Sequence, residues 1–216
     1  MVVVQAGLFY VLIKNSQEII QHAPALLTAA CLVWLLMFIR LLVYRPEQSL
    51  DFQYRIVSFA SSLAALTFAW IAMYSLRVLA GGEWWILVLL LITWSADTGA
   101  YFAGRAFGKR KLAPRISPGK TVAGLVGGLL LAVLVSVSAV HFISAIDATA
   151  IQLIPLTLIT ALVSVAGDLF ISLHKRKSGF KDSGGIFPGH GGVLDRLDSL
   201  LACAPFFALG TLMMGF

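Results

Sequence analysis

The sequence predicts an all-α, polytopic integral membrane protein, and its composition and long apolar runs are the observations that predict it. Of the 216 residues, 59% are hydrophobic and only 12% are charged, whereas about a quarter of the residues of an average soluble domain are charged. The mean hydropathy is +0.92. A helix needs about 20 residues to cross roughly 30 Å of hydrocarbon. Runs of that length recur throughout, so we expect one transmembrane domain over residues 1–216.

Six apolar runs are long enough for membrane-spanning helices. They cover residues 24–45, 54–79, 84–104, 121–143, 150–172 and 199–216. The first apolar stretch, Val2–Ile13, is too short for a full crossing, so it predicts a shallow or incomplete helix and brings the number of helices to six or seven. No basic residue precedes it, so it does not resemble a cleaved signal peptide.

The basic residues predict the orientation of the chain. If the spans alternate in direction, all sixteen Lys and Arg residues except Lys14 and Arg77 fall on one side of the membrane. The positive-inside rule places that side in the cytoplasm. The net charge of +6 then indicates attraction to anionic lipid headgroups rather than to nucleic acid. We therefore expect membrane lipids, and no nucleic acid, among the partners.

A first polar segment, WSADTGAYFAGRAFGKRKLAPRISPGKT, starts at Trp94. On a continuing helix, Asp97, Tyr101 and Arg105 stand at i, i+4 and i+8 and form one polar stripe. An aspartate within a span is costly, which points to a function for Asp97. The alternative is that Asp97 only pairs with Arg105 or caps a neighbour.

The end of this segment, RISPGKT, has the chemistry of a phosphate site. It is not a Walker A motif, because Pro114 stands where the first glycine belongs. Ser117, Lys120 and Thr121 nevertheless offer hydroxyls, an ammonium group and backbone N–H groups just before a helix, where the helix dipole is positive. The alternative is a helix start capped by Ser117, with Lys120 as a membrane-surface charge.

A second polar segment, VAGDLFISLHKR, places Asp168, Ser172 and Lys175 at i, i+4 and i+7 on one helix face. Two other interpretations of Asp168 are a proton-relay group in a transporter and a structural residue paired with Lys175. Three aligned polar groups favour a binding or catalytic site over both.

The third segment, FKDSGGIFPGHGGVLDRLDS, adds further charged and polar residues: Lys181, Asp182, His190, Asp195, Arg196 and Asp198. Asp195 and Asp198 are three residues apart at the start of the last span, so both carboxylates can face one way. With Asp168 from the preceding span they form a plausible Mg²⁺ cradle. Zinc is not expected, because His174 and His190 have no Cys or His partner at ligand spacing.

Cations, paired carboxylates and glycine turns together indicate phosphoryl or nucleotidyl transfer, in which charge neutralisation and positioning carry the catalysis. Glycines interleaved with the charges let the backbone approach a ligand closely. These residues alone do not name the nucleotide.

The run from Ser172 to Asp198, SLHKRKSGFKDSGGIFPGHGGVLDRLD, closely resembles the signature of the bacterial phosphatidate cytidylyltransferases, or CDP-diacylglycerol synthases. The segment from Trp94 is also similar to these enzymes, so the resemblance covers the chain from Trp94 to its C-terminus. One departure is His174, where the family has an apolar residue. The catalytic part is expected over about 94–199, and the spans over 1–90 are fewer than is typical of the family.

The resemblance implies that CTP and phosphatidate react to give CDP-diacylglycerol and pyrophosphate and that Mg²⁺ is required; a second cation beside it is compatible with the same chemistry. It implies Asp168 and Asp195 as catalytic metal ligands and Lys175 as a catalytic phosphate contact. Residues expected to bind substrate are Asp97, Ser117, Lys120, Thr121, Ser172, Arg176, Lys181, Asp182, His190, Arg196 and Asp198. We expect the bacterial inner membrane, a site facing the cytoplasm, and a homodimer as the first assembly to test.

Three other functions can be compared with the sequence. An ion- or proton-coupled transporter is motivated by Asp97 and Asp168, but it predicts mid-membrane charges and an inverted repeat, and the charges gather at one face. A CDP-alcohol phosphotransferase requires D-x-x-D-G, and Ser199 stands at that glycine. A catalytically inactive scaffold is the third.

The orientation is testable by cysteine labelling at Ser183, in the glycine-rich segment. We expect a Ser183→Cys protein to react with a membrane-impermeant maleimide only in inverted vesicles or after permeabilisation. The native Cys31 and Cys203 lie inside apolar runs and serve as the background control. Labelling of intact right-side-out cells would reverse the orientation.

Overall fold

The computed structural model describes residues 2–43, 52–179, 184, 192 and 194–215. The order of elements is α1 (Val2–Lys14), α2 (Ser16–Gln21), α3 (Ala23–Val43), α4 (Phe52–Arg77), α5 (Gly82–Phe107), β1 (Lys111–Ala113), β2 (Ser117–Thr121), α6 (Val122–Phe142), α7 (Ala150–Lys177) and α8 (Leu194–Met213). The predicted all-α fold is confirmed. The small antiparallel β1–β2 hairpin is an addition that the sequence did not predict.

Each predicted run coincides with a helix, but the helices differ in apolar length. Within the described ranges, α4 to α7 are long and apolar enough to cross a membrane. Counting only residues whose side chains are described, the apolar stretches of α1, α3 and α8 run over Val4–Lys14, Ala23–Ile39 and Leu197–Met213. The chain is thus an integral membrane protein. The short α2 follows α1.

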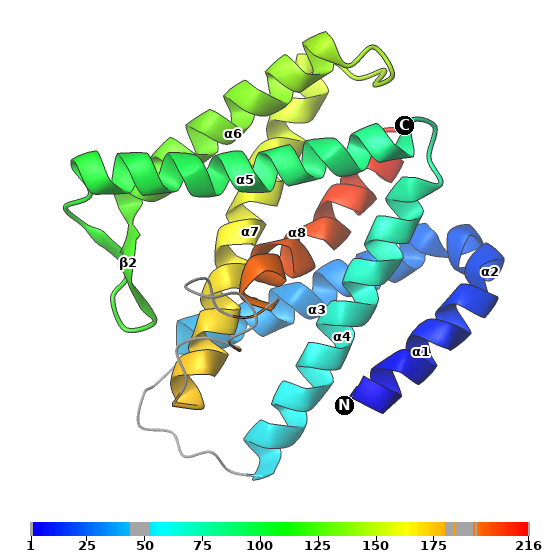
Figure 1. The fold of residues 1–216 in the computed structure, drawn as a ribbon, viewed down its shortest axis with the longest axis horizontal. Coiled ribbons are helices and arrows are strands. Elements are labelled where there is room, and N and C mark those ends of the chain that lie inside the picture. Colours follow the sequence, from blue (N-terminus) through cyan, green and yellow to red (C-terminus); the bar gives the residue numbers. More distant parts are fainter. Residues whose placement is uncertain (1, 44–51, 180–183, 185–191, 193, 216) are drawn as a thin grey trace.

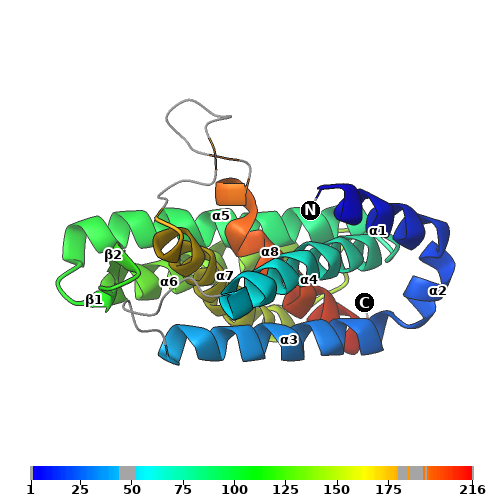
Figure 2. The same ribbon diagram turned by 90° about the horizontal axis from the view of Figure 1, so that it is seen from below.

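The core lies around α8, which packs against α3, α4 and α7 (Figure 1). Turned to the view of Figure 2, α3 lies along the lower side and α5 along the upper side, with α4, α7 and α8 between them. Trp85 of α5 and Phe207 of α8 are almost completely buried in this core, with their ring centroids 6.2 Å apart. Such aromatic pairs stabilise beyond the area that they bury.

Helices α5 and α6 pack closely because glycines line their contact. A Cβ placed at Gly99 would lie 2.6 Å from the Gly127 carbonyl oxygen, and one at Gly128 would lie 2.6 Å from that of Ala96. Small residues at a helix contact let two backbones approach each other in a membrane protein. The same device recurs between α7 and α8, where a Cβ at Gly167 would collide with the Cβ of Ala202.

The α5–α6 contact predicts a clear stability effect. Gly128→Ala puts a methyl group against the Ala96 carbonyl oxygen, so the helices must separate, and we expect a loss of about 1–3 kcal/mol in unfolding free energy. The control is Gly7→Ala in α1, where nothing lies within 4 Å and alanine is the better helix former. Thermal unfolding in detergent measures both; equal midpoints would contradict the packing.

Candidate functional site

Two lysine–carboxylate ion pairs form the centre of the site. Lys120 Nζ of β2 lies 2.6 Å from Asp168 Oδ2 of α7. Lys175 Nζ of α7 lies 2.7 Å from Asp195 Oδ1 of α8. The pairs therefore tie the hairpin, α7 and α8 together along one face of α7.

Asp168 is held on α7 by its own helix as well as by the hairpin. Ser172 Oγ, one turn further along α7, donates a hydrogen bond of 3.1 Å to Asp168 Oδ1. Lys120 Nζ also lies 3.5 Å from the carbonyl oxygen of Val165. The side chains of Lys120 and Asp168 remain 24% and 29% exposed, so a ligand in solution can reach this pair.

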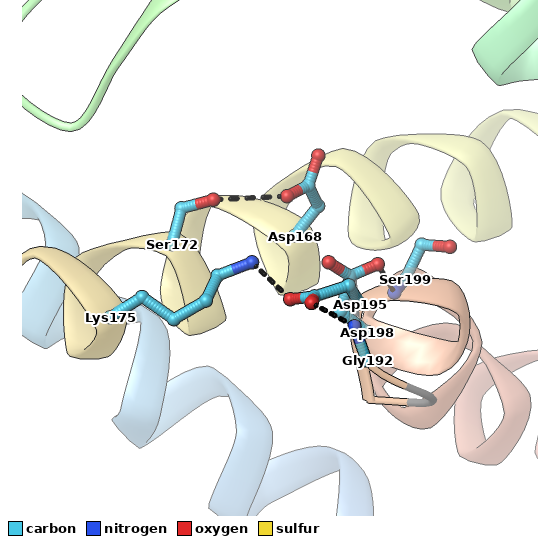
Figure 3. A network of polar contacts seen from close by, with 7 residues as sticks. All are labelled: Asp168, Ser172, Lys175, Gly192, Asp195, Asp198 and Ser199. Carbon is cyan, nitrogen blue, oxygen red and sulfur yellow. Dashed lines mark hydrogen bonds and ion pairs between the residues drawn. The ribbon is translucent and has the colours of Figure 1, made fainter. Parts of the chain in front are cut away.

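Asp195 lies in the first turn of α8 and is more deeply enclosed. Its Oδ2 accepts a hydrogen bond of 2.8 Å from the Gly192 N–H group, and its Oδ1 faces Lys175 (Figure 3). Its side chain is only 9% exposed. The positive end of the α8 dipole adds to the stabilisation of this carboxylate.

Asp198 completes the arrangement one turn along α8. It is buried, and its Oδ1 accepts a 2.7 Å hydrogen bond from the Ser199 N–H group. Asp168, Lys175 and Lys120 are all close enough to act electrostatically on its carboxylate. Figure 3 shows Asp195 and Asp198 on α8 facing Asp168 and Lys175 on α7.

The carboxylates fit a Mg²⁺ ion that completes its shell elsewhere. Among the described residues, no group of three or more His, Cys, Asp or Glu side chains forms a ready-made metal cage. Mg²⁺, however, commonly uses one or two carboxylates together with waters and substrate phosphates. Asp168 and Asp195 offer that partial set, each now held by a lysine.

Two cavities flank this face of α7. One, of about 520 Å³, is bounded by α3, α4, α7 and α8 and has Lys175 in its lining; we call it the α4 cavity. The other, of about 210 Å³, lies against the hairpin and is lined by Asp97, Gly119, Lys120 and Thr121, among others; we call it the hairpin cavity. Each ion pair thus contributes its lysine to a different cavity.

The structure brings together six of the predicted residues: Lys120, Asp168, Ser172, Lys175, Asp195 and Asp198. Asp97 and Thr121 join them through the hairpin cavity. Arg105 Nη1 donates to the Tyr101 hydroxyl at 3.1 Å, as expected for their helical spacing.

Other predicted residues lie apart from this group. Arg176 is exposed at the end of α7. Lys181, Asp182 and His190 lie outside the described residues, as does the side chain of Arg196.

The interpretation of Ser117 as a helix cap is wrong. Ser117 begins β2 and is paired in register with Ala113. The cap of α6 is Thr121, whose Oγ1 accepts a 3.0 Å hydrogen bond from the Gly124 N–H group. The physical reason is that residues 117–121 are extended, so the first orphan N–H groups of the helix lie beyond Thr121.

Sequence reasoning missed the residues of the α4 cavity. Ser58, Ser61 and Ser62 of α4 line it together with Trp34 of α3. A signal was present, because serines at i, i+3 and i+4 mark one face of an otherwise apolar helix. The departure at His174 also has a packing role: its ring stacks on Tyr54, with centroids 5.7 Å apart.

Lysines and carboxylates that meet beside two cavities in a helical membrane protein have the chemistry expected of a site for phosphate groups. The model of the Cytidylyltransferase family matches residues 1–213. The chain therefore belongs to this family.

Similar proteins carry the name phosphatidate cytidylyltransferase. That of Pseudomonas aeruginosa is 39% identical over 206 residues, which cover 95% of this chain and 76% of the relative. That of Haemophilus influenzae is 49% identical over 130 residues, or 59% of this chain and 45% of the relative. That of Bacillus subtilis is 45% identical over 125 residues, or 58% and 46%. The last two matches span less than half of each relative.

The different enclosure of the two ion pairs predicts different costs of breaking them. Lys175→Gln removes the lysine paired with the deeply enclosed Asp195 carboxylate, and we expect about 3 kcal/mol of destabilisation. Asp168 is more exposed to solvent than Asp195, so we expect Lys120→Gln to lower the free energy of unfolding by about 1 kcal/mol or less. Denaturation in detergent measures both, with exposed Lys109→Gln as control. If Lys175→Gln with Asp195→Asn is no more stable than Lys175→Gln alone, the pairing is contradicted.

Proposed function

We propose that this chain is a phosphatidate cytidylyltransferase, which converts CTP and phosphatidate into CDP-diacylglycerol and pyrophosphate. The observation that carries the proposal is that Asp168 and Asp195 are paired with two lysines, each of which lines a different cavity. A transfer between a water-soluble nucleotide and a lipid needs two binding places that meet at one charged point. The names of the relatives support the same reaction.

The hairpin cavity suits the nucleotide. Lys120 provides an ammonium group and Thr121 a hydroxyl, next to the N-terminal end of α6, and helix N-termini favour phosphates. Asp97 lies in the same lining, where a carboxylate is an acceptor for sugar hydroxyls or a base amino group. The α4 cavity, with its largely apolar wall, is then left for the lipid.

The reaction itself is a displacement at phosphorus. A phosphate oxygen of phosphatidate attacks the α-phosphorus of CTP and forms a new P–O bond. The bond from the α-phosphorus to the bridging oxygen of the β-phosphate breaks, and pyrophosphate leaves with the electron pair. The attacking phosphate is already anionic, so the step requires no general base.

The chain's own residues neutralise and position the reacting groups. Lys120 comes from the hairpin and Lys175 from α7 itself, so each can move from its carboxylate to a substrate phosphate. Fixed cations next to developing phosphate charge lower the barrier most when they are preorganised. Ser172 keeps Asp168 oriented while Lys120 changes partner.

Asp168 and Asp195 are the residues that would hold Mg²⁺. The ion, when bound, supplies neutralisation of the triphosphate and of the leaving pyrophosphate. When the two lysines move to substrate phosphates, the carboxylate oxygens of Asp168 and Asp195 become available to the metal ion. The lysine–carboxylate pairs are therefore compatible with a metal site.

The basic ends of the helices support a site that faces the cytoplasm in a bacterial inner membrane. Arg55 lies near the start of α4, Arg105 near the end of α5 and Arg176 near the end of α7, which is the end that alternating spans and the positive-inside rule assign to the cytoplasm. CTP is cytoplasmic, so this orientation brings both substrates to the site. A transporter is not favoured, because the charges gather at this end.

The proposal is tested with purified protein, labelled CTP, phosphatidate and Mg²⁺. We expect CDP-diacylglycerol from the wild type, no product after chelation of Mg²⁺, and at least a 100-fold lower rate for Asp195→Asn because a metal-binding carboxylate is lost. The matched control is Glu83→Gln, which also removes an ion-paired carboxylate, from the Arg77 pair in the α4–α5 turn. No product from folded wild type would refute the activity; an active Asp195→Asn would refute the role of Asp195.

A further inference from the structure

The α4 cavity contains two buried polar groups that the fold leaves without a hydrogen-bond partner. Within the described part of the chain, Trp34 Nε1 and Ser58 Oγ are both buried and make no hydrogen bond. Both side chains line this one cavity, from α3 and α4 respectively. A buried donor without a partner is costly, typically about 1–3 kcal/mol, and calls for an explanation.

The neighbouring serines differ from Ser58 in this respect. Ser61 Oγ and Ser62 Oγ donate to the Ser58 carbonyl oxygen at 3.0 and 2.8 Å. Their donor capacity is therefore used inside the helix. Ser58 Oγ and Trp34 Nε1 are therefore buried donors of the cavity wall that a ligand can satisfy.

The chemistry of the wall defines the ligand group that would satisfy these donors. The indole N–H group can only donate, so the ligand must bring an acceptor. The remaining wall is largely apolar, with Ala65, Leu66, Phe170 and Leu201. An ester carbonyl of a lipid has both features, because it accepts hydrogen bonds without donating any and is attached to an aliphatic chain.

The cavity is also placed correctly for such a ligand. Lys175 lies in its lining and is bound to Asp195, so a phosphate at this lysine has its glycerol esters beside the wall. Its volume of about 520 Å³ is in the usual range for pockets that bind small molecules. A further cavity, of about 590 Å³ beneath the hairpin, has Arg115 and mostly apolar residues in its lining, but neither of the two unpartnered donors.

We propose that the α4 cavity holds the diacylglycerol part of the lipid substrate, and that Trp34 Nε1 and Ser58 Oγ donate hydrogen bonds to its ester carbonyls. This inference rests on the proposed function for the identity of the lipid. It adds a selectivity: the protein prefers ester-linked phosphatidate to its ether-linked analogue, which has the same phosphate and the same chains but no carbonyl oxygen.

The test compares binding of diacyl and dialkyl phosphatidate in mixed detergent micelles. The readout is thermal stabilisation of the purified protein as a function of lipid mole fraction, which needs no turnover. A neutral hydrogen bond changes affinity roughly two- to tenfold, so we expect at least fivefold tighter binding of the diacyl lipid. Ser58→Ala and Trp34→Phe should each reduce this preference about fivefold or abolish it, by weakening binding of the diacyl lipid alone.

Two controls separate this role from a structural one. Ser62→Ala removes a hydroxyl from the same wall whose donor is already used, and the preference should persist. Ser58→Ala removes an unsatisfied buried group, so the unliganded protein should unfold at the same temperature or higher. Trp34→Phe also loses packing against Phe38 and Phe170, but that loss affects both lipids equally.

The outcomes are distinguishable from those of the activity assay. Equal binding of both lipids by the wild type, or an unchanged preference in both variants, overturns the inference even if CDP-diacylglycerol is formed. A preference that is lost in the variants supports it even if turnover fails. The KM for CTP should remain unchanged in Ser58→Ala, since this side chain lies in the other cavity.

Discussion

The close approach of α7 and α8 is the constraint on which the site depends. It is possible because Gly167 has no side chain where Ala202 of α8 lies. The next residue on α7 is Asp168, so the point of closest approach also sets the distance between the carboxylates of the two helices. Gly167 and Ala202 are therefore necessary to the charged site, although neither carries a polar side chain. A larger side chain at either position would force α7 and α8 apart, and with them Asp168 and Asp198.

Electrostatic interactions then determine how the charged side chains are arranged where α7 and α8 meet. Three carboxylates meet near the end of a largely apolar protein, where like charges repel and burial is costly. Lysines from two different directions offset this: Lys120 arrives from the hairpin and Lys175 from α7 itself. The hairpin has no apolar core of its own, and its ion pair with α7 is one of the contacts that hold it at the site. The Lys120–Asp168 ion pair thus both holds the hairpin in place and forms part of the charged site.

Sequence reasoning succeeded where the relevant geometry is local. The helical spacing of Asp168, Ser172 and Lys175 predicts one face, and the observed Ser172–Asp168 hydrogen bond follows from it. The spacing of Asp195 and Asp198 predicts their common orientation in the same way. The partner of Asp168 could not be predicted, because Lys120 reaches it through an extended hairpin and only tertiary packing brings the two together. The role of Trp34 and Ser58 could not be predicted for the same reason. Each is an ordinary residue of an apolar helix, and only the packing of α3 and α4 around one cavity brings the two side chains together.

Thr121 connects the hairpin to the rest of the molecule in an unusual way. Its hydroxyl caps α6, its side chain lines the hairpin cavity, and it fits beneath the end of α5, where a Cβ at Gly104 or Gly108 would meet it. Fraying of the first turn of α6 would release this hydroxyl and remove part of the cavity wall at once. Local unfolding of the first turn of α6 would consequently also open the hairpin cavity. Any ligand held there stabilises the first turn of α6 by the free energy of its own binding.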